Sequence, residues 1–354
     1  MGAQQAMQQD NEFRIAGRRI GPAHPPLVVA EIGINHEGDF GKAIRMIDDA
    51  RAAGCECVKF QSHVIEDEMI PAAGKVIPGN ASVSILEIMQ RCAFDEAQEA
   101  ELKRYTEAAG MIYLSTPFSR AAADRLQRLD VAAYKIGSGE CNNYPLIDHI
   151  AAFGKPMIIS TGMNSIETVQ PAVDILRRRG VPYALLHVTS MYPTPYHKVR
   201  LGAMVQLQQV FPDAVVGLSD HTLTNYTCLG AVALGASILE RHFTSDRSWP
   251  GPDIEVSMDP AALADLVEGS RAIHLALGGS KDILADEQPT IDFAYACVVA
   301  IRDIAAGETL GMDNIWVKRP GTGEILAKDF ESLLGRKAGR AIAKDAQLRR
   351  DWLA

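Results

Sequence analysis

The chain has 354 residues and a formal net charge of −9, with 47% hydrophobic and 22% charged residues. This composition is typical of a folded globular protein, and its acidic balance argues against a nucleic-acid-binding surface, which needs clustered basic residues. No apolar segment reaches the ~18 residues of a membrane-spanning helix, and the polar, Gln-rich residues 1–11 lack the apolar core of a secretion signal, so we expect a cytoplasmic protein.

The chain contains six cysteines, which a protein of this size can keep reduced. Cys55 and Cys57 have the C-x-C spacing of some metal sites, but they begin an apolar run that is typical of a strand. We therefore interpret both as buried thiols.

Eight short apolar runs each end in polar or charged residues. They comprise residues 27–31, 57–61, 111–116, 132–138, 156–161, 183–190, 214–221 and 238–242. Stretches with helical periodicity, such as 40–53 and 121–129, separate most of the runs. This repeated order predicts an α/β protein with a (β/α)8 TIM barrel, in which the carboxyl ends of the strands form one site.

The segments around these runs complete the predicted architecture. Residues 12–20 have the pattern of a small hairpin or lid, and a helix over 262–277 closes the barrel. The surplus residues 64–93, which contain prolines and glycines, are expected to pass over the barrel mouth. We assign residues 1–281 to the barrel, 282–294 to a polar linker and 295–354 to a small C-terminal domain.

His221 and His242 end the seventh and eighth runs, which are neighbouring strands in a closed barrel. Two neutral imidazoles there can share a divalent metal such as Mn²⁺, Fe²⁺ or Zn²⁺, with Asp220 and Glu240 as candidates for supporting contacts. The alternative is a pair of ordinary hydrogen-bonded histidines.

Lys59 and Lys135 end the second and fourth runs in apolar surroundings, where an ammonium group is costly unless it meets an anion. Hydroxyl groups end other runs around the same opening, at Thr116, Ser138, Ser160 and Ser219. This set predicts a cradle for a phosphate and a carboxylate. A Schiff-base lysine or lysines that point outward are the alternatives.

Other residues at the predicted mouth have more varied chemistry. Glu31 ends the first run and is a candidate general acid or base, or a group that positions a water. Tyr192 and Asp253 lie in proline-rich loops and could bind a hydroxylated ligand. Arg319 precedes a Pro-Gly turn in the small domain, from which it could reach sugar hydroxyls or an amide.

Ten motifs, in order from about residue 11 to the C-terminus, resemble those of bacterial sialic acid (N-acetylneuraminate) synthases, with a tail similar to their antifreeze-protein-like (SAF) domain. They are AEIGINHEG (30–38), VKFQ (58–61), STPF (115–118), YKIGSGE (134–140), STGM (160–163), YPTP (192–195), GLSDHT (217–222), ERHFT (240–244), PGPD (250–253) and KRPGTG (318–323).

This resemblance implies a transferase that condenses phosphoenolpyruvate with N-acetylmannosamine to give N-acetylneuraminate and phosphate. It also implies a role in carbohydrate biosynthesis, such as that of a capsule polysaccharide. It implies that His221 and His242 hold Mn²⁺, or another divalent ion such as Mg²⁺ or Co²⁺. It implies phosphoenolpyruvate contacts from Lys59, Thr116, Lys135, Ser138, Ser160, Ser190 and Ser219. It implies sugar contacts from Gln61, Tyr192, Asp253, Phe293 and Arg319, the last from the other subunit of a domain-swapped homodimer. At Ser190 the family pattern often has Asn.

Two other functions are compatible with parts of this pattern. A related synthase would give legionaminate, pseudaminate or a 9-phosphate product, but a phosphorylated sugar calls for additional basic residues, for which only Arg247 and Arg319 are candidates. A non-catalytic sugar-binding protein would have no use for the combination of paired histidines, paired lysines and Glu31.

Overall fold

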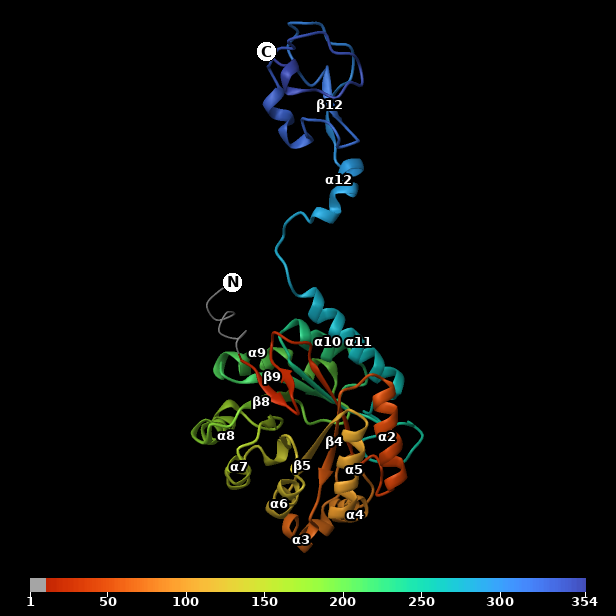
Figure 1. Ribbon diagram of the computed structural model, residues 1–354, viewed down its shortest axis with the longest axis vertical. Coiled ribbons are helices and arrows are strands. Elements are labelled where there is room, and N and C mark those ends of the chain that lie inside the picture. The colour runs from red at the N-terminus through yellow and green to blue at the C-terminus, as the bar shows by residue number, and fades with distance from the viewer. Residues whose placement is uncertain (1–10) are drawn as a thin grey trace. The chain divides into compact units, whose positions relative to one another are not determined.

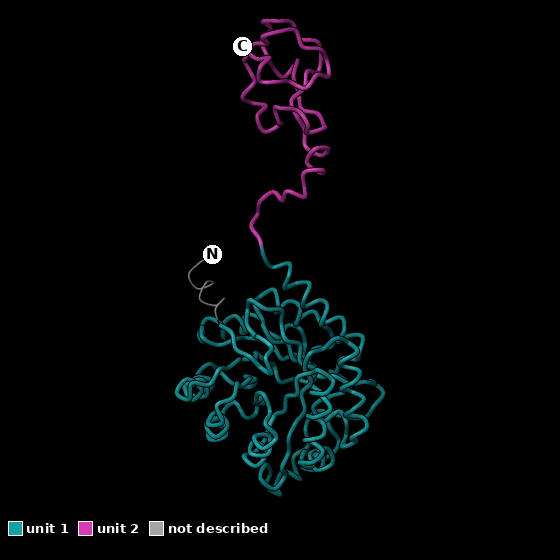
Figure 2. The backbone as a smooth tube through the Cα atoms, viewed as in Figure 1, with its two compact units in different colours: residues 1–278 teal, residues 279–354 magenta. Residues whose placement is uncertain are grey.

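The computed structural model describes residues 11–354, and the chain divides into two compact units between Gly278 and Gly279 (Figure 2). Residues 1–10, on which the expectation of no secretion signal mostly depends, lie outside the described part. Among the described residues, no helix is both long enough and apolar enough to cross a membrane.

Eight parallel strands form the central sheet of the first unit: β3 (Leu27–Gly33), β4 (Cys57–Ser62), β5 (Ile112–Pro117), β6 (Tyr134–Ile136), β7 (Met157–Ser160), β8 (Tyr183–Val188), β9 (Val215–Asp220) and β10 (Ile238–His242). They pair in the order β5-β4-β3-β10-β9-β8-β7-β6. The two end strands, β5 and β6, also pack against each other, so the sheet forms a nearly closed barrel (Figure 1). The predicted (β/α)8 fold is confirmed, because each strand coincides with one of the eight apolar runs.

Helices surround this barrel: α2 (Phe40–Ala52), α5 (Glu96–Ala108), α6 (Arg120–Arg128), α7 (Tyr144–Ala151), α8 (Ile166–Arg179), α9 (Leu201–Val210), α10 (Tyr226–Ala233) and α11 (Pro260–Ala276). Several begin at a side chain that accepts a hydrogen bond from the first turn, as Asp39 does for α2 and Asp259 for α11. The predicted helices over 40–53, 121–129 and 262–277 are confirmed to within two residues.

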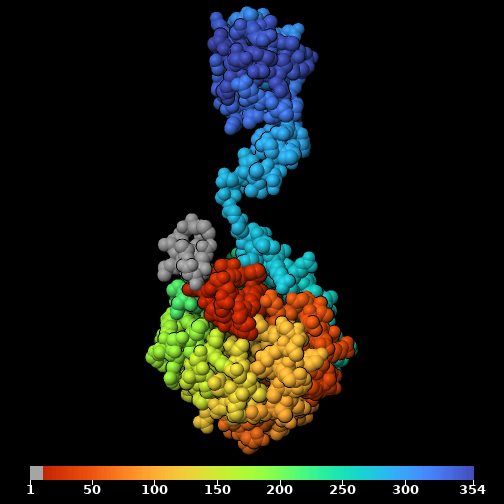
Figure 3. Space-filling model, viewed as in Figure 1, coloured from red at the N-terminus to blue at the C-terminus, as the bar shows by residue number. Residues whose placement is uncertain are grey.

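An antiparallel hairpin of β1 (Phe13–Ile15) and β2 (Arg18–Ile20) precedes the barrel. Ile15 and Ile20 are fully buried in one cluster with Leu27 and other residues near the starts of the barrel strands. The hairpin therefore covers the amino-terminal end of the barrel and is not a lid over the mouth. Figure 3 shows this part of the chain, in red, at the surface of the first unit.

The excursion between β4 and α5 contains α3 (Ile65–Glu68), the 3-10 turn η1 (Pro71–Lys75) and α4 (Ile85–Cys92). The Asn80 side chain in this segment donates a hydrogen bond to the carbonyl oxygen of Pro252, at 3.0 Å, in the loop that follows β10. This contact confirms that the excursion reaches the loops at the barrel mouth.

The second unit has a separate core around the antiparallel strands β11 (Cys297–Ala300) and β12 (Ile315–Lys318). Three 3-10 turns and one helix complete it: η4 (Ala285–Glu287), α12 (Gln288–Ala294), η5 (Ala327–Leu333) and η6 (Arg350–Trp352). The segment expected as a polar linker over 282–294 thus contains the short helix α12, which its low hydrophobicity did not indicate.

Two glycines test how tightly the barrel is packed. A Cβ on Gly217, in β9, would overlap the backbone carbonyl oxygen of Ile238 and lie 2.7 Å from Leu186 Cδ2. The Gly217→Ala variant is expected to lower the free energy of unfolding by about 1–3 kcal/mol. Gly202, in α9, has open space around its Cβ position, so Gly202→Ala is the matched control. The control should be neutral or stabilising by up to about 1 kcal/mol. Thermal unfolding followed by circular dichroism measures both, and equal melting temperatures would contradict the prediction.

Candidate active site

A cavity of about 350 Å³ opens at the carboxyl ends of the barrel strands. Every site residue predicted within the barrel lines it: Glu31, Lys59, Gln61, Thr116, Lys135, Ser138, Ser160, Ser190, Tyr192, Ser219, His221, His242 and Asp253. The two predicted residues outside the barrel, Phe293 and Arg319, belong to the second unit, and their proposed contacts stay predictions.

Strand alternation explains why these residues share the cavity. Successive side chains of a strand point to opposite faces, so residues two apart point to the same side. In β10, Glu240 and His242 both line the cavity. Arg241 between them instead donates a hydrogen bond to Asn225 Oδ1, next to α10. Asp220, expected to support the histidines, likewise lies beside Arg241 at 3.6 Å, on the outer side of the barrel.

Four charged side chains form a buried cluster in the cavity. Lys59 Nζ lies 2.7 Å from Glu31 Oε2 and 3.9 Å from Glu240 Oε1, and Lys135 Nζ lies 3.4 Å from the same Glu240 oxygen. All four side chains are at least 93% buried. The lysines therefore point inward, and the alternative in which they point outward is wrong.

The cluster shifts the pKa values of its members according to their partners. Burial alone would lower the pKa of Lys59, but Glu240 and Glu31 raise it above its ordinary value. Burial lowers the pKa of Lys135 and the Lys59 charge adds to this shift, which Glu240 and, to a smaller extent, Glu31 offset only in part. Burial opposes ionisation of Glu240, yet the two lysines lower its pKa. At neutral pH Glu240 thus keeps its charge.

Hydroxyl groups complete the surroundings of the two ammonium groups. Thr116 Oγ1 accepts a hydrogen bond from Lys59 Nζ at 3.1 Å, and Ser160 Oγ accepts one from Lys135 Nζ at 2.7 Å. The backbone N–H of Gly162 donates to Ser138 Oγ at 3.0 Å. These groups give the cavity several hydrogen-bond donors close to two cations, which is the arrangement that binds anions.

The imidazoles of His221 and His242 lie side by side, with ring centroids 5.5 Å apart. His221 Nδ1 lies 3.0 Å from the carbonyl oxygen of Thr189, so Nδ1 carries the proton and Nε2 keeps its lone pair. Burial, and then the neighbouring His242, lower the pKa of His221 to about 3, which keeps the ring neutral. Tyr192 stacks on His221 at 4.0 Å.

The donor set of these two rings fits a divalent cation with open positions. His242 Nδ1 is buried without a hydrogen-bond partner and lies 3.8 Å from Asp253 Oδ2. Within residues 11–354, no group of three His, Cys, Asp or Glu side chains is arranged to hold a metal. Two imidazole ligands would therefore leave most coordination positions to substrate and water.

Sequence reasoning missed two residues of the cavity wall. Glu240, expected only as a supporting contact, lies two residues before His242 in the same strand, which places both side chains on one face. Glu140 follows Ser138 in the turn η2 (Ser138–Glu140), and its Oε2 is buried without a partner. Burial raises the pKa of Glu140 to about 7. No local pattern marks this residue, since its burial depends on the turn.

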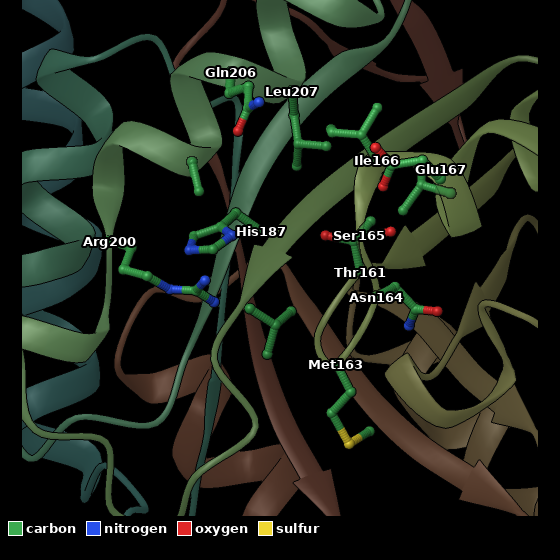
Figure 4. A pocket seen from close by; sticks show the side chains of 13 residues that line it. Thr161, Met163, Asn164, Ser165, Ile166, Glu167, His187, Arg200, Gln206 and Leu207 are labelled. Carbon is green, nitrogen blue, oxygen red and sulfur yellow. The ribbon is translucent and has the colours of Figure 1, made fainter.

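A second cavity, of about 510 Å³, lies between the loops that follow β7 and β8 (Figure 4). His187 and Arg200 lie on one side of it, and Asn164 and Ser165 lie on the other. It contains none of the predicted site residues, but it shares the lining residues Met163 and Val188 with the first cavity.

Comparison with known proteins places this chain among synthases of nine-carbon acidic sugars. The NeuB family model matches residues 46–282, and the SAF domain model matches residues 295–354. Human N-acetylneuraminate-9-phosphate synthase is 34% identical over 93% of this chain and 93% of its own length. The N,N'-diacetyllegionaminic acid synthase of Campylobacter jejuni is 36% identical over 91% of this chain and 98% of its own.

A solved structure agrees with these relationships. This is the N-acetylneuraminic acid (sialic acid) synthetase from Leptospira borgpetersenii, crystallised in complex with citrate. It is 31% identical to this chain, and the two structures superpose with a TM-score of 0.72 over 79% of this chain and 95% of the synthetase chain. The extent of these matches, together with the barrel and its cavity, shows that the chain belongs to the NeuB family and ends in a SAF domain.

Proposed function

We propose that this member of the NeuB family catalyses the metal-dependent condensation of phosphoenolpyruvate with N-acetylmannosamine, which gives N-acetylneuraminate and phosphate. The observation that carries the proposal is the presence of two buried lysines and two adjacent buried histidines in one cavity. The lysines suit a phosphate and a carboxylate, whereas the histidines suit a metal that activates an aldehyde.

The phosphoenolpyruvate end of the cavity would be the side of Lys59 and Lys135. Their ammonium groups, with the hydroxyls of Thr116 and Ser160, would bind the two anionic groups and stabilise the phosphate as it leaves by C–O cleavage. Ser190 also lines this cavity, so it remains a candidate contact although its side chain is shorter than Asn.

The sugar end would lie beside His221 and His242. Mn²⁺, or Mg²⁺ or Co²⁺ in its place, would act there as a Lewis acid on the aldehyde oxygen of the open-chain sugar. Gln61, Tyr192 and Asp253 would hold the sugar hydroxyls. Glu31, beside Lys59, would orient the water that adds to C2 or take up a proton from it.

Phe293 and Arg319 would complete the sugar site from the second unit of a partner subunit in a domain-swapped homodimer. The support for this part is chemical: Phe293 is 62% exposed in α12, and Arg319 follows β12 directly. An exposed aromatic ring and a guanidinium are groups that can cover a sugar and bind its amide.

A related 2-acetamido sugar is the second candidate substrate, because relatives of similar identity are named as synthases of different products. A phosphorylated sugar is disfavoured. Among residues 11–354, Lys59 and Lys135 are the only lysines that line the cavity; both lie beside carboxylates and are assigned to phosphoenolpyruvate.

Substrate identity can be tested with a panel of sugars. The protein is incubated with phosphoenolpyruvate, Mn²⁺ and either N-acetylmannosamine, its 6-phosphate or a diacetamido hexose, and the products are identified by mass spectrometry. We expect N-acetylneuraminate, with the highest kcat/KM for N-acetylmannosamine. A higher kcat/KM for a diacetamido hexose or the 6-phosphate would replace the substrate proposed here.

The metal role predicts that removal of divalent ions with a chelator abolishes phosphate release and that Mn²⁺ restores it. His221→Ala and His242→Ala should each weaken Mn²⁺ binding by at least about tenfold, since each removes a ligand. Titration calorimetry measures the binding, and His197→Ala, at an exposed position, is the matched control. Phosphate release that persists after complete metal removal would refute this role.

The anion cradle predicts that charge at position 135 supports phosphoenolpyruvate. Lys135→Met should reduce kcat/KM for phosphoenolpyruvate by at least about tenfold, the effect of losing a hydrogen bond to a charged group. Lys135→Arg keeps the charge and should lose less, while Lys328→Met, at an exposed site, should change nothing. Steady-state kinetics at saturating sugar provides the measurement. Equal losses in the Met and Arg variants would show that charge is not the decisive property.

A further inference from the structure

A line of buried polar contacts leads from the excursion after β4 to the cavity. His63 follows β4 and is only 3% exposed. Its Nδ1 lies 2.7 Å from Glu68 Oε2, in α3, and its Nε2 lies 3.0 Å from Gln61 Oε1. The ring stacks on Phe118, with centroids 4.7 Å apart and planes 15° apart. His63 thus connects Glu68 to Gln61, a residue that lines the cavity.

The hydrogen bonds of Gln61 fix the direction of its amide. Its Nε2 group donates to Glu31 Oε1 at 3.3 Å, which leaves Oε1 directed at His63. An amide oxygen only accepts hydrogen bonds, and so does an ionised carboxylate. The two ring nitrogens of His63 therefore face two acceptors, Gln61 Oε1 and Glu68 Oε2.

This arrangement requires an additional proton in the pair formed by His63 and Glu68. Either the imidazole is protonated on both nitrogens, or the Glu68 carboxyl carries a proton and the ring is protonated on Nε2. In both forms the Nε2–H donates to Gln61 Oε1. A ring protonated on Nδ1 alone would place a lone pair against Oε1, and the amide would turn over. Its oxygen would then face the Glu31 carboxylate, which is unfavourable.

The helix that carries Glu68 is anchored by a contact that does not involve His63. The neighbouring Asp67 accepts a hydrogen bond from the backbone N–H of Ala121 at 2.7 Å, at the first turn of α6. This contact holds α3 against α6, so the backbone at Glu68 does not depend on the ring for its position. His63, clamped between Glu68 and Phe118, can therefore transmit a defined orientation to Gln61.

We propose that His63 and Glu68 are positioning residues that set the orientation of the Gln61 amide and, through it, of the Glu31 carboxylate. The proposal rests on the proposed function for the role of Gln61 at the sugar. In this arrangement the Nε2–H of His63 donates the hydrogen bond to Gln61 Oε1. Glu68, on the other ring nitrogen, keeps the imidazole in the form that carries this proton.

The protonation state can be measured without substrate. In protein labelled with ¹⁵N at histidine, the His63 ring signals are assigned by their loss in the His63→Asn variant. We expect a proton on both ring nitrogens or on Nε2 alone. His36, whose Nδ1 accepts a hydrogen bond from the Gly38 N–H at 3.0 Å, provides the reference for a bare Nδ1. A His63 ring protonated on Nδ1 alone would overturn the proposal, whatever reaction the protein catalyses.

Two substitutions of His63 separate positioning from a structural role. A Gln side chain places its amide nitrogen near the position of the imidazole Nε2, whereas an Asn side chain places its nitrogen near that of Nδ1. His63→Gln should therefore keep the KM for the sugar within about threefold of the unaltered value, and His63→Asn should raise it about tenfold. The KM for phosphoenolpyruvate should stay unchanged in both. Equal impairment of the two variants would contradict the proposal.

A double-mutant cycle with Gln61→Ala completes the test. Because His63 acts through Gln61, His63→Asn should have no further effect on the sugar KM in the Gln61→Ala background. Additive effects would overturn the proposal. Glu66→Gln, an exposed position on the same helix, is the matched control for changes in α3 and should leave all constants unchanged. If Gln61→Ala alone leaves the sugar KM unaltered, the proposed contact between Gln61 and the sugar is wrong. The protonation of the His63 ring then still tests whether His63 sets the orientation of the Gln61 amide.

Discussion

The burial of two lysines inside the barrel is the constraint on which the rest of the cavity depends. An ammonium group in this environment needs a partner, because transfer of an unpaired charge out of water is costly. Glu31 and Glu240 supply these partners from β3 and β10, two adjacent strands. Removal of one member would leave another charge buried and unpaired. The four side chains therefore form one unit whose members are difficult to replace singly.

The contacts around this cluster are layered outward from the strands. The strand ends position the charged groups, and the loop that follows β8 positions Tyr192 against the ring of His221. The excursion after β4 adds Asn80, which contacts the loop after β10. It also adds His63, which does not line the cavity itself but contacts Gln61, a residue that does. Long loops commonly carry function on a rigid scaffold. Here part of the loop sequence orients residues of the strand that precedes it.

The sequence was sufficient to locate most of the cavity, because the signals involved are local. Strand alternation and helical periodicity are visible in one segment at a time, and the carboxyl ends of parallel strands must converge. Lys59, His221 and His242 could be predicted in this way. The pairing of Glu240 with Lys135 could not, since it depends on the approach of β10 and β6 across the barrel interior.

Features that depend on contacts distant in the chain were less accessible. The hairpin at the start was correctly predicted as a hairpin, but only the packing of Ile15 and Ile20 beneath the strands shows which end of the barrel it closes. Polar composition over 282–294 gave no sign of α12. The stacking of His63 on Phe118 joins residues from two loops, so no single segment indicates it.

The absence of a side chain at position 162 links two positions of the cavity wall. A Cβ on Gly162 would overlap Ser190 Oγ and lie 2.7 Å from Ser138 Oγ. The space available to residue 190 is therefore set by residue 162, which also stands next to Met163 in the wall between the two cavities. A longer side chain such as Asn at 190 demands glycine at 162 even more strictly. Position 162 is therefore confined to the one residue that leaves room for the side chain at position 190.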